Sequence, residues 1–192
     1  LADEADALLN SAETIAKANT EERQSMRARL MLGRGTIHWL FVDLNAAEKC
    51  ADLAIAAFQL QADRLGVGDG KWFLASIAEE NGNAQLRDEY LESVIEDYRA
   101  SAGEVRLDTS IARFIERSCY RDSKSSAERL NQVFAGDKAY DKVLTAWLAS
   151  ARATVAAHTG KSGRAIKYYM QAYEAALDTG QIRQAVLSAS NA

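Results

Sequence analysis

The chain has 192 residues, a mass of 21.0 kDa and a formal net charge of -4 at pH 7. It contains no proline, alanine is its most frequent residue, and no apolar run approaches the ~20 residues that a membrane span requires. This composition predicts an all-α chain with short turns, and its acidic balance (pI ≈ 5.3) excludes a typical nucleic-acid-binding protein, which carries a basic face.

An internal repeat of about 40 residues runs along the chain. Small or apolar residues recur at spacings of four and then three, most clearly at Ala47, Ala51, Ala54 and at Ala165, Tyr169, Ala172. The other copies are Ala5, Leu9, Ala12; Arg87, Leu91, Val94; and Ala127, Asn131, Phe134. The last members lie at 12, 54, 94, 134 and 172, so the intervals are 42, 40, 40 and 38. Such a period predicts a stack of similar units.

Each unit is predicted to be a helical hairpin, because short polar or Gly-containing stretches separate helix-length segments. First helices are expected over 21–42, 70–80, 104–120, 138–158 and 181–192, and second helices over 2–18, 45–64, 84–100, 124–135 and 163–178. Gly or Asn in the turns ends one helix, and Ser or Asp caps the next. Small residues such as Gly35 and Ala165 are expected where the paired helices touch, so larger side chains there should destabilise the fold.

These features resemble tetratricopeptide (TPR) repeats over nearly the whole chain, best at 35–54 and 153–172. The period is longer than usual, the proline after the second helix is missing, and Arg87 and Asn131 depart from the small-residue pattern. Longer variants of this kind are similar to regions of bacterial signalling proteins ahead of GGDEF diguanylate cyclase domains, and to parts of large ATP-dependent transcription activators. The resemblance implies one domain over 1–192, a right-handed α-α superhelix of about four and a half hairpins.

A superhelix of this type lines its concave groove with the first helices. All three tryptophans, Trp39, Trp72 and Trp147, fall on predicted first helices. Tryptophan and tyrosine combine a large contact area with a polar tip, which suits a binding surface, although each Trp could instead fill space between repeats. The expected groove residues are Arg29, Thr36, Trp39, Trp72, Ser76, Glu79, Glu116, Tyr120, Trp147, Thr154 and His158.

Motifs of enzyme chemistry are incomplete. The GKS at 160–162 lacks the glycine of a phosphate loop at Val155, and Trp72 follows the Gly-rich stretch 66–71 where Ser or Thr is required. Both stretches are interpreted as helix-ending loops, as is the DTG at 178–180. His38 and His158 have no metal-ligand neighbours at a suitable spacing, and Cys50 and Cys119 fit buried small hydrophobes. No catalytic residue, cofactor or metal site is predicted.

The function expected from the repeats is therefore non-catalytic: a cytoplasmic interaction or sensory module that binds a peptide or partner domain in its groove and regulates an attached signalling output domain. The alternatives are a structural scaffold or dimerisation spacer, a non-catalytic part of a transcription regulator, or a part of an enzyme whose catalytic domain lies elsewhere. Neither nucleic acid nor a membrane is expected as a direct partner. The sequence is expected to be a piece of a longer protein, whose last segment, 181–192, either self-associates or frays because its apolar stripe lacks a following helix.

Overall fold

The computed structural model describes residues 7, 11, 21–101, 104–135 and 140–192. About 85% of the structure is helical and no described residue lies in a strand, which confirms the all-α prediction. The chain divides into two compact units, residues 1–103 and 104–192. The first repeat copy, Ala5, Leu9 and Ala12, and the second helix expected over 2–18 lie outside the described residues.

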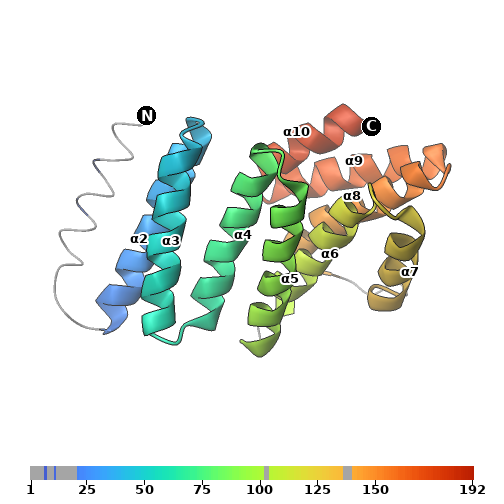
Figure 1. The fold of residues 1–192 in the computed structure, drawn as a ribbon. Helices are drawn as coiled ribbons and strands as arrows, with labels where there is room; N and C mark the ends of the chain where they lie inside the picture. Colours follow the sequence, from blue (N-terminus) through green and yellow to red (C-terminus); the bar gives the residue numbers. More distant parts are fainter. Residues whose placement is uncertain (1–6, 8–10, 12–20, 102–103, 136–139) are drawn as a thin grey trace. The chain divides into compact units, whose positions relative to one another are not determined.

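The described part of the first unit consists of two helical hairpins that follow one another along the chain (Figure 1). Helix α2 packs on α3, α4 packs on α5, and α3 contacts α4 between the two hairpins. Sequence-adjacent packing of this kind is what a helical repeat requires. The helices are α2 (Glu21–Leu40), α3 (Leu44–Leu60), α4 (Arg64–Glu80) and α5 (Ala84–Ala100).

The small residues of the repeat lie at the helix contacts, as predicted. Ala47, Ala51 and Ala54 on α3 are fully buried. A Cβ built on Gly35 of α2 would lie 2.8 Å from the Phe73 ring and 3.2 Å from the Ala47 carbonyl oxygen. The paired helices therefore approach closely only because these side chains are small.

Helix α4 begins at Arg64, so the helix start expected at residue 70 is wrong, and so is the interpretation of the Gly-rich stretch 66–71 as a helix-ending loop. Gly66, Gly68 and Gly70 lie inside the helix and are buried. A Cβ on Gly66 would overlap the Phe58 ring of α3, and one on Gly68 would overlap the Tyr98 ring of α5. These glycines let the start of α4 fit between its two neighbours, and this packing outweighs their low helix propensity.

A single type of turn ends α2, α3 and α4 and recurs twice in the second unit. At the end of α2 the Asp43 N–H donates to the His38 carbonyl at 2.9 Å, the long hydrogen bond of a Schellman motif. The same bond forms from Asp63, Asn83, Lys161 and Gln181 to Phe58, Ala78, Ala156 and Ala176. The residues before these donors have positive φ: Val42, Ala62, Gly82, Gly160 and Gly180. The helix-ending role predicted for the glycine-containing turns is confirmed at the last three positions.

The second unit contains two hairpins and one further helix (Figure 1). Helix α8 packs on α6 and α9, α9 packs on α10, and α7 makes smaller contacts with α6 and α8. Ala165, Tyr169 and Ala172 on α9 are buried as expected, and Ala165 and Tyr169 share a core cluster with Ala153 of α8. The helices are α6 (Glu104–Ser118), α7 (Ser123–Val133), α8 (Lys142–His158), α9 (Ser162–Asp178) and α10 (Ile182–Asn191).

Candidate functional site

The predicted groove residues on α2 and α4 are partly engaged within the first unit. Arg29 forms ion pairs with Asp63 (3.5 Å) and Asp69 (4.0 Å) and also lies over the Phe58 ring. Glu79 lies 4.0 Å from the Arg87 guanidinium. Arg29 and Glu79 therefore link neighbouring helices of this unit.

Thr36 and Ser76 bond to their own helices. The Thr36 hydroxyl donates to the Leu32 carbonyl at 3.0 Å, and the Ser76 hydroxyl donates to the Trp72 carbonyl at 3.2 Å. Thr36 is exposed and Ser76 is half-buried. Both hydroxyl groups already satisfy a backbone carbonyl of the preceding turn, so they add little directional binding capacity of their own.

Two of the three tryptophans contact the neighbouring first helix. The Trp39 ring of α2 meets Phe73 of α4 edge-on, with 6.2 Å between the ring centroids. The Arg113 guanidinium of α6 lies 5.7 Å from the centre of the Trp147 ring of α8. Trp39, Trp72 and Trp147 are all half-buried. Trp39 and Trp147 thus fill space between helices while keeping part of each indole open to solvent.

The groove residues predicted on α6 and α8 separate into a surface pair and a buried pair. Tyr120, just beyond α6, and His158, the last residue of α8, are both exposed and pack edge-to-face with 4.8 Å between ring centroids. Glu116 and Thr154 are buried. Glu116 accepts a 2.7 Å hydrogen bond from Ser150, and the Thr154 and Tyr169 hydroxyls lie 3.2 Å apart. Glu116 and Thr154 therefore stabilise the unit's interior and present no surface to a partner.

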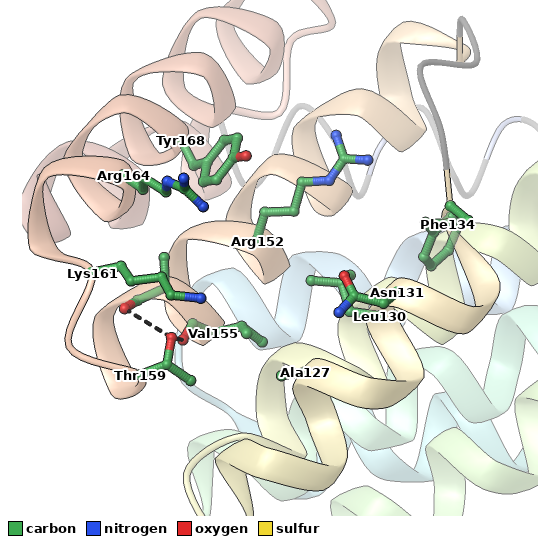
Figure 2. Close-up of a pocket in the computed structure, with 12 residues that line it drawn as sticks. Ala127, Leu130, Asn131, Phe134, Arg152, Val155, Thr159, Lys161, Arg164 and Tyr168 are labelled. Carbon is green, nitrogen blue, oxygen red and sulfur yellow. Dashed lines mark hydrogen bonds between the residues drawn. The ribbon is translucent and has the colours of Figure 1, made fainter.

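A cavity of about 530 Å³ lies between α7, α8 and α9 (Figure 2). None of the predicted groove residues lines it. Its floor is apolar, with Leu130, Phe134 and Val155 buried, whereas the polar residues around it are exposed or half-buried. Figure 2 shows Lys161, Arg164 and Tyr168 on one side, Arg152 in the middle and Asn131 on the α7 side. We call this hollow the basic cavity; it is lined by Ala127, Leu130, Asn131, Phe134, Ala135, Arg152, Val155, Ala156, Thr159, Lys161, Arg164 and Tyr168.

The described lining of the basic cavity is positively charged. Arg152, Lys161 and Arg164 contribute three cations, and no lining residue that the structure describes bears a carboxylate. Within the part of the chain that the structure describes, these three side chains form no ion pair with an acidic residue. A second cavity of about 490 Å³ on α8 and α9 shares Arg152 with the first. It differs because Glu174 and Asp178 line it, and Asp178 pairs with Lys142 at 3.0 Å.

Lys161 and Arg164 flank the start of α9, and both line the basic cavity. Lys161 is the residue before the first turn, and its side chain makes no capping hydrogen bond, whereas Asp122 and Asp141 cap α7 and α8. The Arg164 N–H donates to the Lys161 carbonyl at 2.9 Å within this turn. The two cations therefore reach the cavity from one helix start.

The sequence analysis did not identify the basic cavity. The signal was present in the TGKSGR segment, which places Lys161 and Arg164 around a helix start. In the structure α8, and not a strand, precedes this turn, so the segment lacks the strand–loop–helix context of a phosphate loop. The sequence does not show that Arg152 lies near Lys161 and Arg164, because only the packing of α8 against α7 and α9 brings Arg152 to the same cavity.

Comparison of the sequence with known proteins does not assign the chain to a family. The sequence matches no protein-family model, and no curated protein is significantly similar to it. Among the described residues, no group of three or more His, Cys, Asp or Glu side chains is arranged to hold a metal ion. None of the described helices combines the length and apolarity needed to cross a membrane.

Proposed function

We propose that this chain is a non-catalytic binding module of the TPR-like helical-repeat type, whose first helices present a surface to a peptide or to a partner domain. Tyr120 and His158 carry the proposal. They occupy equivalent positions of successive first helices, 38 residues apart, yet their exposed rings meet at 4.8 Å. Repeats that bring equivalent aromatic side chains together on the surface create a contact area with polar tips, which suits a binding site.

The wider context of the proposal rests on the repeat pattern. A superhelix of successive hairpins, located in the cytoplasm of a bacterium, would couple partner binding to an attached output domain such as a diguanylate cyclase. Sequence-adjacent packing of helices in each unit supports the repeat on which this interpretation depends.

A structural scaffold is the second candidate, and the Trp39–Phe73 and Arg113–Trp147 contacts favour it. In a scaffold the tryptophans only fill space between helices, and no exposed aromatic side chain binds a partner. The two functions differ in what happens when the exposed Tyr120–His158 pair is removed, because only the binding module loses an activity.

The test is a selection of binders from a random peptide library, followed by fluorescence anisotropy with the full chain. We expect the double variant Tyr120→Ala/His158→Ala to bind the selected peptides at least about ten-fold more weakly at an unchanged melting temperature. The matched control is Ile166→Ala/Met170→Ala, which removes two exposed side chains from α9 of the same unit. Failure to select any binder, or equal binding by both double variants, would contradict the proposed surface and favour the scaffold.

A further inference from the structure

Three cations and no carboxylate are found among the described residues that line the basic cavity. Arg152 comes from α8, Lys161 from the turn before α9 and Arg164 from α9, so three separate positions supply the cations. Lys71 in the first unit shows the contrast, because it forms an ion pair with Asp97 at 2.6 Å. Cations that line one cavity repel one another, and an anionic ligand would relieve that repulsion.

The charge and geometry of the cavity fit a phosphate group better than a single carboxylate. A phosphate monoester carries about −1.5 to −2 charges and three acceptor oxygens, whereas a carboxylate carries one charge and two oxygens. Arginine recognises phosphate with paired N–H donors, and lysine contributes a point charge.

The cavity is also larger than a phosphate ion needs. Its volume of about 530 Å³ lies within the range of roughly 300–1,000 Å³ that is usual for small-molecule sites. Leu130, Val155 and Phe134 form an apolar floor, and the Phe134 ring is held edge-on against Tyr140 at 6.0 Å. This floor can bury the body of an organic molecule, while Asn131 and Tyr168 offer hydrogen-bonding groups beside it.

We propose that the basic cavity binds a phosphate monoester of a small organic molecule. Lys161 and Arg164 hold the phosphate, Arg152 neutralises its remaining charge, and the apolar floor contacts the organic body. This site is separate from the Tyr120–His158 surface, none of whose residues lines the cavity. The Tyr120→Ala/His158→Ala variant and the cavity variants therefore change different residues, so the failure of one proposal can be told from the failure of the other.

The experiment is an NMR titration of the full ¹⁵N-labelled chain with adenosine monophosphate, adenosine and inorganic phosphate as probes. We expect inorganic phosphate and the nucleotide to shift the amide signals of Ser162, Gly163 and Arg164. The nucleotide should also shift those of Leu130 and Phe134 and bind at least about ten-fold more tightly than adenosine, because only it places charged oxygens on the cations.

Matched variants locate the site. Lys161→Gln/Arg164→Gln should weaken nucleotide binding by at least about ten-fold, since it removes two cations that line the cavity. Lys124→Gln/Lys167→Gln removes the same charge from exposed positions of α7 and α9 outside the cavity and should change the affinity by less than two-fold. Lys161 and Arg164 are themselves exposed, so thermal melts of both double variants should match the wild type.

Four results would overturn the proposal. The first is the absence of shifts at Ser162–Arg164 with both phosphate-bearing probes at 10 mM, and the second is equal weakening by the two double variants. The third is equal affinity for inorganic phosphate and the nucleotide, which would reduce the cavity to an unspecific anion site. The fourth is tighter binding of a phosphoserine-containing pentapeptide than of the nucleotide, which would assign the cavity to a phosphorylated protein segment.

Discussion

Val42 and Ala62 hold backbone conformations that glycine adopts at the equivalent helix ends. Their φ angles are 64° and 54°, close to the 70° of Gly82. A side chain at such a φ crowds the neighbouring carbonyl, at a cost of roughly 1–2 kcal/mol, and a β-branched residue is the least suited to it. The turn forms regardless, because two backbone hydrogen bonds and the Asp43 or Asp63 cap hold it in place.

Replacing Val42 with glycine should therefore stabilise the chain. Val42 is 77% exposed, so the variant loses little apolar contact while the strain at positive φ is removed. We expect a gain of roughly 1 kcal/mol, measured by chemical denaturation, after the greater entropy of glycine in the unfolded state is counted. Val105→Gly, at an exposed position inside α6, is the control and should lower stability. Equal losses in both variants would contradict the strained turn.

Cys119 should react far more slowly with a thiol reagent than Cys50. Burial, together with the negative charges of Asp122 and Glu116, raises the pKa of the Cys119 thiol to about 11, so almost no thiolate forms at pH 8. Burial also raises the pKa of Cys50, but Arg34 opposes that rise and the side chain is only half-buried.

The measurement is the time course of the reaction with a chromogenic disulfide at pH 8. We expect one thiol to react in the native state and the second only after unfolding in guanidinium. A Cys50→Ser variant should retain only the slow reaction. Rapid modification of Cys119 in that variant would show that its thiol is accessible.

At the scale of the element, α4 begins with three glycines, although glycine is a poor helix former. Gly66, Gly68 and Gly70 fit the helix start between Phe58, Ile55 and Tyr98. Glycine lowers helix propensity by up to ~1 kcal/mol at each position, which is why the stretch resembles a loop in the sequence. The glycines let α4 approach these three apolar side chains closely, and the buried apolar contact offsets the loss of helix propensity.

Gly66→Ala and Gly163→Ala should shift stability in opposite directions. The added Cβ overlaps the Phe58 ring at Gly66, and overpacking of this kind costs ~1–3 kcal/mol. At Gly163 the Cβ meets nothing within 4 Å, so alanine should stabilise α9 by up to ~1 kcal/mol. Thermal melts of the two variants measure the difference. Stabilisation by both would indicate that α4 does not pack against Phe58.

At the scale of the whole molecule, α10 leaves apolar side chains uncovered in the second unit. Ala185 is buried, but Ile182 is 61% and Val186 59% exposed, so the stripe expected over 181–192 is only partly covered by α9. An uncovered helix face in a repeat is a route to contacts between molecules.

Self-association through this face should be abolished by Val186→Glu, which places a charge in the exposed stripe. Size-exclusion chromatography with light scattering should detect a dimer of the wild type at high concentration and a monomer of the variant. Ile166→Glu introduces the same charge at a 50% exposed position of α9 and should leave association unchanged. A strictly monomeric wild type would exclude association through α10.

The sequence by itself determined the helical class, the small residues at the helix contacts and most of the helix ends. These features are local: the spacing of Ala47, Ala51 and Ala54 follows from the helix period, and Gly82, Gly160 and Gly180 follow from the backbone conformation that ends a helix. The sequence also listed Tyr120 and His158 as groove residues, but the contact between their rings is seen only in the structure.

The burial of individual residues and the charges that lie near them were decided only by the tertiary structure, because they depend on how the helices pack. It turned the glycines of 66–70 into a buried helix start, placed Glu116 and Thr154 in the interior, and brought Arg152 beside Lys161 and Arg164. In each case the deciding partner lies on another helix: Phe58 for Gly66, Ser150 for Glu116 and the start of α9 for Arg152. Helix periodicity orients a side chain around its own axis, but burial and charge neighbours depend on which helices lie opposite and how closely they approach.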